Sequence, residues 1–131
     1  MQNKLMIRAE VIHAIIRRED RFLLGRRSLS KQIDSGYWAT IGGRVEQGES
    51  LEAGLIRECL EEIGVKVRPI RKLTTVEDSE TSHHWFDVEL ISGEPFLVCD
   101  ENSELRWFTV EEMKLLFPIV HEEIEILRSS Y

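Results

Sequence analysis

Cysteine is scarce in this sequence, and no long apolar run occurs in it. The two cysteines, Cys59 and Cys99, lie far apart without the spacing of a metal site, which excludes a disulfide scaffold and a cysteine-based zinc site. We expect both thiols to be buried and reduced. No apolar stretch approaches the roughly 20 residues that a bilayer span needs, and the first residues lack the cleavage site of a signal peptide. These absences predict a cytoplasmic protein that does not bind membranes.

Positive charge is also in short supply. The chain has 17 lysines and arginines against 24 acidic residues, a net charge of −7. Such a balance argues against binding polymeric nucleic acid, because a phosphate backbone needs a basic surface. A small anionic ligand stays compatible where a bound cation or a few arginines neutralise it. The length of 131 residues, 42% of them hydrophobic, predicts a single folded domain over residues 1–131.

Apolar residues in alternating or continuous stretches predict six strands. These strands are residues 5–17, 21–27, 37–43, 65–78, 83–90 and 104–109. Pro69 lies in the fourth strand, and because proline cannot donate to a β-ladder, it predicts an edge strand or a bulge there.

Three helices are predicted, at residues 51–63, 110–117 and 120–128. Ser50 suits the N-cap of the first helix, and Gly64 suits the position just after its end. Thr109 and Glu112 form a capping box for the second helix, and Pro118 separates it from the third. The order of strands, helix, strands and helices predicts the α+β class, with helices packed on a mixed sheet.

The first predicted helix concentrates three glutamates, Glu58, Glu61 and Glu62, within five residues. At about 100° per residue they share one arc of the helix, and each like-charged pair destabilises it by a few tenths of a kcal/mol. Arg57 flanks this arc, but no lysine or arginine lies at a helical spacing that offsets Glu58 or Glu62. A separate apolar arc is expected to face the core; it consists of Leu55, Ile56, Cys59, Leu60 and Ile63.

Two interpretations of the acidic arc are open. One is a solvated helix face on which Arg57 pairs with Glu61. The other is a cation site, because hard divalent ions such as Mg²⁺ take carboxylate ligands. The double glycine Gly42–Gly43 precedes the helix, and glycine lets a backbone approach such a site closely. This feature favours the cation site.

Residues 43–65 read G-x5-E-x7-R-E-C-L-E-E-I-G-V. This pattern resembles the Nudix box, the signature of the Nudix hydrolases, here of the MutT-like type. The fixed positions of the box are occupied by Gly43, Glu49, Arg57, Glu58, Glu61, Glu62 and Gly64. Two residues depart from the usual pattern: Cys59 replaces an aliphatic residue, and Ile41 replaces a frequent proline. The resemblance implies a Nudix-type α/β/α sandwich and hydrolysis of a nucleoside diphosphate linked to another group, by attack of water on phosphorus.

The resemblance also implies roles for individual residues. Mg²⁺ or Mn²⁺ is expected on Glu58, Glu62, Glu61 and the Gly42 carbonyl, while Arg57 holds a carboxylate such as Glu49 in place. The general base is either Glu58 or a downstream acid. Among Asp100, Glu101 and Glu104, the family pattern selects Glu101, six residues before Trp107. The pair Arg26 and Arg27 is expected to bind substrate phosphates.

The nature of the substrate stays open at the level of sequence. The length and the arginine pair resemble members that convert nucleoside di- or triphosphates to monophosphates. The proline of ADP-ribose hydrolases and the tyrosine of dinucleoside-polyphosphate hydrolases have no counterpart after the box. A nucleotide-sugar hydrolase and a non-catalytic nucleotide sensor are the alternatives. The side chains of residues 83–86, HHWF, form either a base-stacking wall or part of the core. Many members dimerise, so the resemblance also allows a homodimer.

Overall fold

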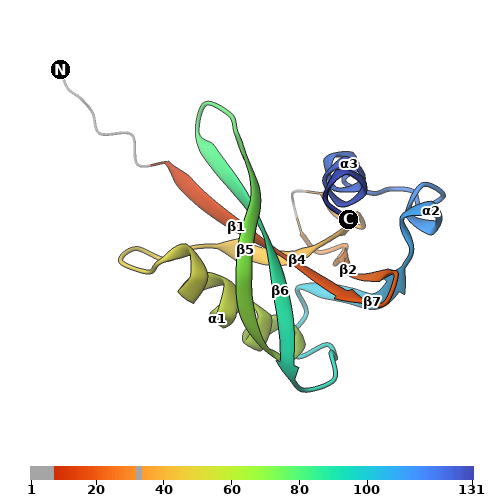
Figure 1. Cartoon of the computed structure of the whole chain (residues 1–131), viewed down its shortest axis with the longest axis horizontal. Coiled ribbons are helices and arrows are strands. Elements are labelled where there is room, and N and C mark those ends of the chain that lie inside the picture. Colours follow the sequence, from red (N-terminus) through yellow and green to blue (C-terminus); the bar gives the residue numbers. More distant parts are fainter. Residues whose placement is uncertain (1–7, 32–33) are drawn as a thin grey trace.

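The computed structural model describes residues 8–31 and 34–131, in which the chain forms seven strands and three helices. Figure 1 labels these elements along the chain. Their bounds are β1 Ala9–Arg18, β2 Arg21–Arg27, β3 Trp38–Ala39, β4 Ile41–Arg44, α1 Leu51–Ile63, β5 Lys66–Glu77, β6 Thr81–Ser92, β7 Asn102–Phe108, α2 Val110–Met113 and α3 His121–Ser130. The start of the first predicted strand, residues 5–7, lies outside the described part.

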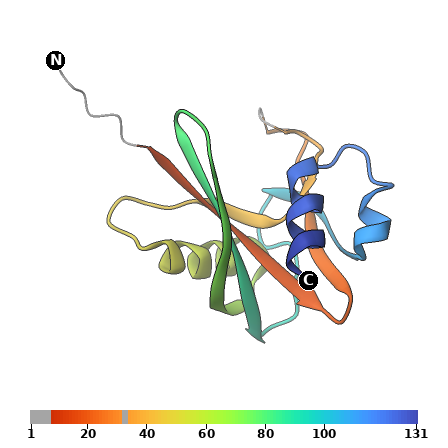
Figure 2. The same cartoon turned by 45° about the horizontal axis from the view of Figure 1, so that its top comes forward.

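The strands form a mixed sheet of order β3-β2-β1-β6-β5, in which β4 also pairs with β1 and β7 with β2. The β1–β6 pair is parallel and the others are antiparallel. The strand expected at 37–43 is in fact two, because β3 pairs with β2 whereas β4 pairs with β1. Helix α1 and helix α3 lie on opposite sides of the crossing strands (Figures 1 and 2). The predicted α+β class with flanking helices is confirmed.

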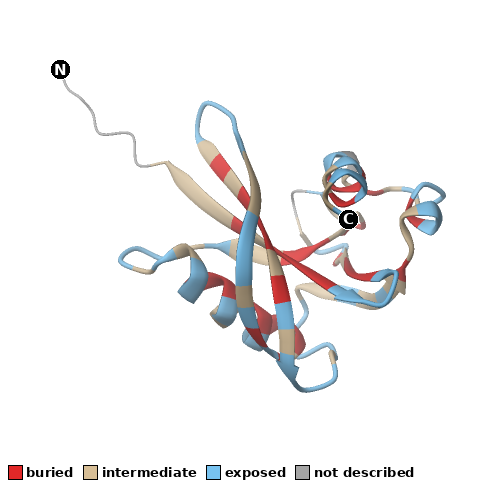
Figure 3. Cartoon of the chain, in the orientation of Figure 1, coloured by how far each residue is buried: buried red, intermediate tan, exposed pale blue. Residues whose placement is uncertain are grey.

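Two hydrophobic clusters lie on the two faces of the sheet, and β1 contributes to both. Ile12, Ala14 and Ile16 pack with Leu55, Cys59 and Ile63 of α1, whereas Ile15 packs with Trp85 and with Leu127 of α3. Successive residues of a strand point to opposite faces, which explains this division. Figure 3 shows buried residues following both the crossing strands and the inner side of α1.

Some burial predictions were wrong. Ile56 and Leu60 are 38% and 54% exposed, because the apolar arc of α1 is wider than the face that the sheet covers. Cys59 is buried as expected, but Cys99 is exposed, since it lies in the loop between β6 and β7.

The two prolines that were expected to interrupt regular structure, Pro69 and Pro118, lie where α2 and β5 can be compared with the prediction. Helix α2 stops at Met113 instead of residue 117, and the chain continues in turns up to Pro118, which disfavours helical backbone at the residue before it. Strand β5 is at an edge of the sheet, and its register shifts between Pro69 and Arg71, which confirms the prediction made from that proline. None of the helices in the described ranges has the length and apolar character to cross a membrane.

The aromatic stretch of β6 belongs to the core. His84, Trp85 and Phe86 are each less than a tenth exposed, so they do not form the base-stacking wall that was one interpretation of this stretch. Trp85 stacks on His13 of β1 with ring centroids 4.3 Å apart. Its indole nitrogen donates to the carboxylate of Glu123, a buried residue of α3. These contacts join the sheet to the C-terminal helix.

The burial of His13 predicts that this residue's contribution to the free energy of unfolding decreases in acid. Its burial, followed by the charges of His83 and His84, lowers its pKa from 6.5 to about 3, although the Glu123 carboxylate lies 3.7 Å from its Nδ1. A histidine that must stay neutral in the folded state contributes stability above the unfolded pKa, and this contribution is lost as the pH falls below 6.5. The slope is at most about 1.4 kcal/mol per pH unit.

The measurement is urea unfolding at pH 7 and pH 5. Between pH 7 and pH 5, we expect the free energy of unfolding of the wild type to change by about 2 kcal/mol in the destabilising direction relative to His13→Gln, which has no proton to gain. An equal fall in both proteins would show that His13 does not govern this acid response.

Candidate active site

Local sequence sets both ends of α1. The Ser50 side chain accepts a hydrogen bond from the Ala53 amide at 3.0 Å, as expected for an N-cap. Gly64 takes the left-handed conformation with φ 69°, and its amide donates to the Leu60 carbonyl. Because this conformation favours glycine, the helix ends where the sequence predicted. The box glutamates are thereby held on a rigid element.

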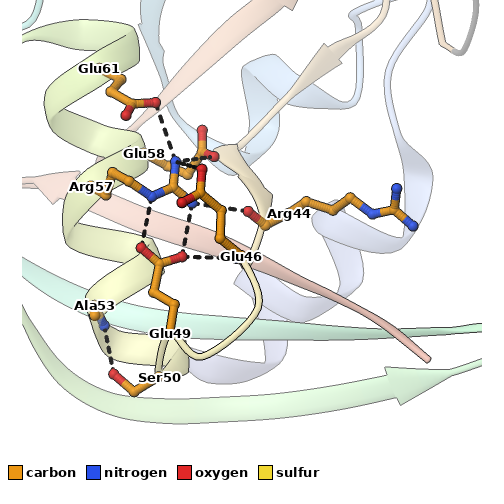
Figure 4. A network of polar contacts seen from close by, with 8 residues as sticks. All are labelled: Arg44, Glu46, Glu49, Ser50, Ala53, Arg57, Glu58 and Glu61. Carbon is orange, nitrogen blue, oxygen red and sulfur yellow. Dashed lines mark hydrogen bonds and ion pairs between the residues drawn. The ribbon is translucent and has the colours of Figure 1, made fainter. Parts of the chain in front are cut away.

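Arg57 is the centre of an ionic network on α1 (Figure 4). It holds Glu49 with two hydrogen bonds, from Nε at 2.7 Å and from Nη2 at 3.0 Å. Its Nη1 donates to Glu58 at 2.9 Å and to Glu61 at 3.2 Å, and Nη2 donates to the Arg44 carbonyl at 3.1 Å. The Arg57 hydrogen bonds are the main reason that the pKa of Glu49 is lowered to about 2.

This network corrects one point of the sequence interpretation. Arg57 does offset Glu58, its immediate neighbour, because its long side chain turns back along the helix surface. The network also clamps the loop before α1 to the helix, through Glu49 and the Arg44 carbonyl. A planar guanidinium with five donors suits this task.

Gly43 leaves room for the Glu58 side chain. A Cβ atom at this position would lie 2.7 Å from the carboxyl carbon of Glu58, so any other residue would displace that carboxyl group. Its neighbour Gly42 is packed against β1, where a Cβ would lie only 1.9 Å from the Ile12 carbonyl oxygen. The double glycine therefore lets strand β4 lie close to both β1 and the Glu58 side chain of α1.

Glu62 is a buried carboxyl group, only 7% exposed. Burial, a hydrogen bond with Glu58 and the charges of Glu58 and Glu101 raise its pKa to about 9. The Asn102 amide contacts it at 3.4 Å. The loop after β6 covers this end of α1, since the Val98 amide donates to the Glu62 carbonyl at 3.1 Å. Two adjacent carboxyl groups of low exposure repel each other unless a proton or a cation offsets their charge.

Glu61 does not join the Glu58–Glu62 pair. Its side chain is 59% exposed and contacts Arg57. Among the residues that the structure describes, no group of three or more His, Cys, Asp or Glu side chains is close enough to hold a metal ion as it stands. We expected all three carboxylates to converge, but only those of Glu58 and Glu62 do. Glu61 directly precedes Glu62, and since successive residues of a helix point in different directions, its side chain lies on the solvent side of α1.

The downstream acids lie in different surroundings. Glu101 is near Glu62, as its effect on the pKa of Glu62 indicates, and it pairs with Lys31 at 2.5 Å and with Arg27 at 3.9 Å. Glu104 lies on β7 and contacts Arg26 at 3.4 Å. Asp100 is exposed, while its carbonyl accepts from Ser28.

The arginine pair is divided between two partners. Arg26 donates to the Gly36 carbonyl at 3.1 Å and pairs with Glu104, whereas Arg27 lies beside Glu101. Sequence reasoning missed Lys31 and Asn102, which no helical or strand periodicity marks. The only available signal for Asn102 was its position next to Glu101.

Arg57→Lys tests the clamp. A lysine cannot hold Glu49 with two parallel bonds and also reach Glu58, so we expect kcat to fall by about 10- to 100-fold while the fold is retained. Arg44→Lys is the matched control. Arg44 joins the network through its backbone carbonyl, and the Arg44 guanidinium points away from the network (Figure 4). The measurement is steady-state hydrolysis together with thermal unfolding; equal rates in the two variants would contradict the role of the clamp.

Comparisons with known proteins agree with this geometry. The NUDIX domain family model matches residues 6–129. The NAD-capped RNA hydrolase NudC of Salmonella heidelberg (strain SL476) is 30% identical over 139 residues, which cover 94% of this chain and 50% of that protein. The chain spans about half the length of the curated relatives it matches.

Solved structures agree as well. The MutT protein of Methanosarcina mazei Go1 superposes with a TM-score of 0.80 at 27% identity, covering 92% of this chain and 91% of that one. The MutT NUDIX hydrolase of Burkholderia pseudomallei superposes with a TM-score of 0.79 at 27% identity, covering 95% and 99%. With the match of the family model over nearly all of its length, the chain belongs to the Nudix family of hydrolases.

Proposed function

We propose that this protein is a Mg²⁺- or Mn²⁺-dependent pyrophosphohydrolase that converts nucleoside di- or triphosphates to monophosphates. The observation that carries the proposal is the pair formed by the half-buried Glu58 and the buried Glu62 behind Gly43, with the charge of Glu101 close by. A pair of carboxylates in a partly desolvated position needs a cation or a proton, and a phosphate substrate brings further negative charge to it.

The residues present fit a hard divalent cation. All the candidate donors are oxygens, the preference of Mg²⁺, which commonly uses one or two protein carboxylates with water and substrate phosphates. Glu58 and Glu62 would hold the ion, and the Gly42 carbonyl and the Glu61 carboxylate are the further candidate donors. When bound, such an ion neutralises charge on the phosphates and lowers the pKa of a bound water.

The protein's own groups supply positioning and proton transfer. Arg57 keeps Glu58 in place through the network around Glu49, so its contribution is orientation. Both Glu101 and Glu104 are partly exposed and paired with cations. Glu101 is our choice for the general base, because its charge acts on the Glu58–Glu62 pair. Glu58 is the alternative base. Arg26 and Arg27 are placed at the end of β2 nearest these acids and would bind phosphates.

A second candidate is the hydrolysis of a dinucleotide pyrophosphate such as NAD. The support for it is that several relatives about 30% identical are named NAD-capped RNA hydrolases. These proteins are about twice as long as the matched region, and the net charge of −7 disfavours a long RNA partner. We therefore place the nucleoside di- and triphosphates first.

The test is a screen with Mg²⁺ and with Mn²⁺ in which the nucleoside monophosphate formed from each substrate is quantified by liquid chromatography. The panel contains nucleoside di- and triphosphates, NAD, ADP-ribose, nucleotide sugars and an NAD-capped oligoribonucleotide. Fastest turnover of a nucleoside di- or triphosphate to its monophosphate is the expected result. Fastest turnover of NAD would establish the second candidate, and binding of nucleotides without any hydrolysis would overturn the proposal in favour of a sensor.

A further inference from the structure

Lys31 is a cation at the edge of the candidate site. Hydrogen bonds of the surrounding turn fix the position of its backbone. The Ser28 amide donates to the Glu101 carbonyl at 3.1 Å, and the Ser28 hydroxyl donates to the Asp100 carbonyl at 2.5 Å. The Lys31 amide in turn donates to the Ser28 carbonyl at 3.1 Å. The turn that follows β2 is thereby attached to the acidic turn before β7. This attachment brings residues 31 and 101 together, although they are distant in sequence.

The Lys31 side chain makes one strong contact. Its ammonium group donates to the Glu101 carboxylate at 2.5 Å, and both side chains are about a third exposed. The hydrogen bond with Glu101 is the main reason that the pKa of Lys31 is raised, so the group is fully charged at neutral pH. Glu101 directly precedes Asn102, whose amide contacts the Glu62 carboxylate at 3.4 Å, and the charge of Glu101 contributes to the raised pKa of Glu62. Lys31 therefore carries a positive charge to the border of the acidic pair.

The Lys31 ammonium group can exchange Glu101 for another anionic partner. A lysine ammonium is a compact charge with three donors on a flexible stem, so it can leave a carboxylate without any movement of the backbone. Glu101 also has Arg27 near its other oxygen, which means that the carboxylate keeps a cation when Lys31 departs. A phosphate that approaches the Glu58–Glu62 pair would offer Lys31 a more highly charged acceptor.

We propose that Lys31 binds a phosphate group of the substrate and is held on Glu101 until that phosphate arrives. This inference rests on the proposed function for the identity of the ligand as a pyrophosphate. It adds a substrate-binding residue outside the Nudix box, together with a competition: Glu101 and the substrate phosphate are alternative partners of one ammonium group. Departure of Lys31 also leaves one oxygen of the Glu101 carboxylate available to a water molecule, while Arg27 stays near the other.

The competition predicts a double-mutant cycle in binding. The probe is imidodiphosphate, titrated by ³¹P NMR in the presence of EDTA, so that neither turnover nor cation binding contributes. Lys31→Met is expected to weaken binding by about tenfold, the value of a charge-assisted hydrogen bond. Glu101→Gln should tighten binding several-fold when Lys31 is present, because Lys31 is released, and much less in the Lys31→Met background.

Controls separate this role from general electrostatics and from folding. Lys72→Met removes an exposed charge from β5, at the opposite edge of the sheet, and should leave the affinity within about twofold of the wild type. Lys31→Arg should retain most of the wild-type affinity for imidodiphosphate. Thermal unfolding identifies any variant that does not fold.

Two results would overturn the inference. One is an unchanged affinity in Lys31→Met, which would make the Lys31–Glu101 pair a purely structural link. The other is an equal gain from Glu101→Gln in both backgrounds, which would reflect only the lost negative charge. Failure of the proposed function looks different: the cycle would hold in EDTA, while no member of the substrate panel would be hydrolysed.

Discussion

Replacing both Glu58 and Glu62 by glutamine is expected to abolish nearly all hydrolysis, with a loss in kcat of about 10³-fold or more. Removing one preorganised charge-stabilising group from an active site already costs about 10²- to 10³-fold, and this variant removes both carboxylates that would hold the cation. Stability should change little in the absence of metal. The pKa of Glu62 is raised to about 9, so glutamine replaces a group that is already largely protonated at neutral pH.

The measurement is hydrolysis of the best substrate of the panel with saturating Mg²⁺, accompanied by thermal unfolding with and without Mg²⁺. Wild-type protein should gain thermal stability from Mg²⁺, and the double variant should not. Glu52→Gln is the matched control, since it removes an exposed carboxylate from the first turn of the same helix. Undiminished hydrolysis in the double variant would refute the assignment of the cation to this pair.

Gly42→Ala is expected to have the largest effect on folding. A Cβ at residue 42 would lie 1.9 Å from the Ile12 carbonyl oxygen of β1, and both atoms belong to paired backbone that cannot move aside independently. The β1–β4 ladder must separate, at a cost of about 3 kcal/mol or more. Because a domain of this size has only about 5–15 kcal/mol of net stability, a large drop in the unfolding midpoint follows.

Gly43→Ala provides the contrast from the next residue. Its Cβ would meet the end of the Glu58 side chain, at 2.7 Å from the carboxyl carbon, and a flexible side chain can move. We expect a modest change in stability but a loss of activity of about 10²-fold, since small misplacement of a reacting group has that cost. Urea unfolding and steady-state kinetics of the two variants test this contrast. Equal loss of stability in both would contradict it.

The sequence by itself determined the local features of this protein. The bounds of α1 follow from Ser50 and Gly64, because capping depends on one side chain or one backbone conformation. The Nudix box was also readable as a pattern of fixed spacing, and the resemblance to that family implied the pairing of Arg57 with Glu49. The mixed sheet with flanking helices followed from the order of the predicted elements.

Only the tertiary structure decided which of these residues meet. The division of residues 37–43 into β3 and β4 depends on two different partner strands, and no local pattern specifies a partner. The exposure of Ile56 and Leu60 depends on how much of α1 the sheet covers. The contacts of Glu62 come from Val98 and Asn102, which are distant from it in sequence, and the Lys31–Glu101 pair depends on hydrogen bonds between two distant turns. Local conformation is a property of neighbouring residues, whereas burial and partnership arise from contacts that the chain makes only when folded.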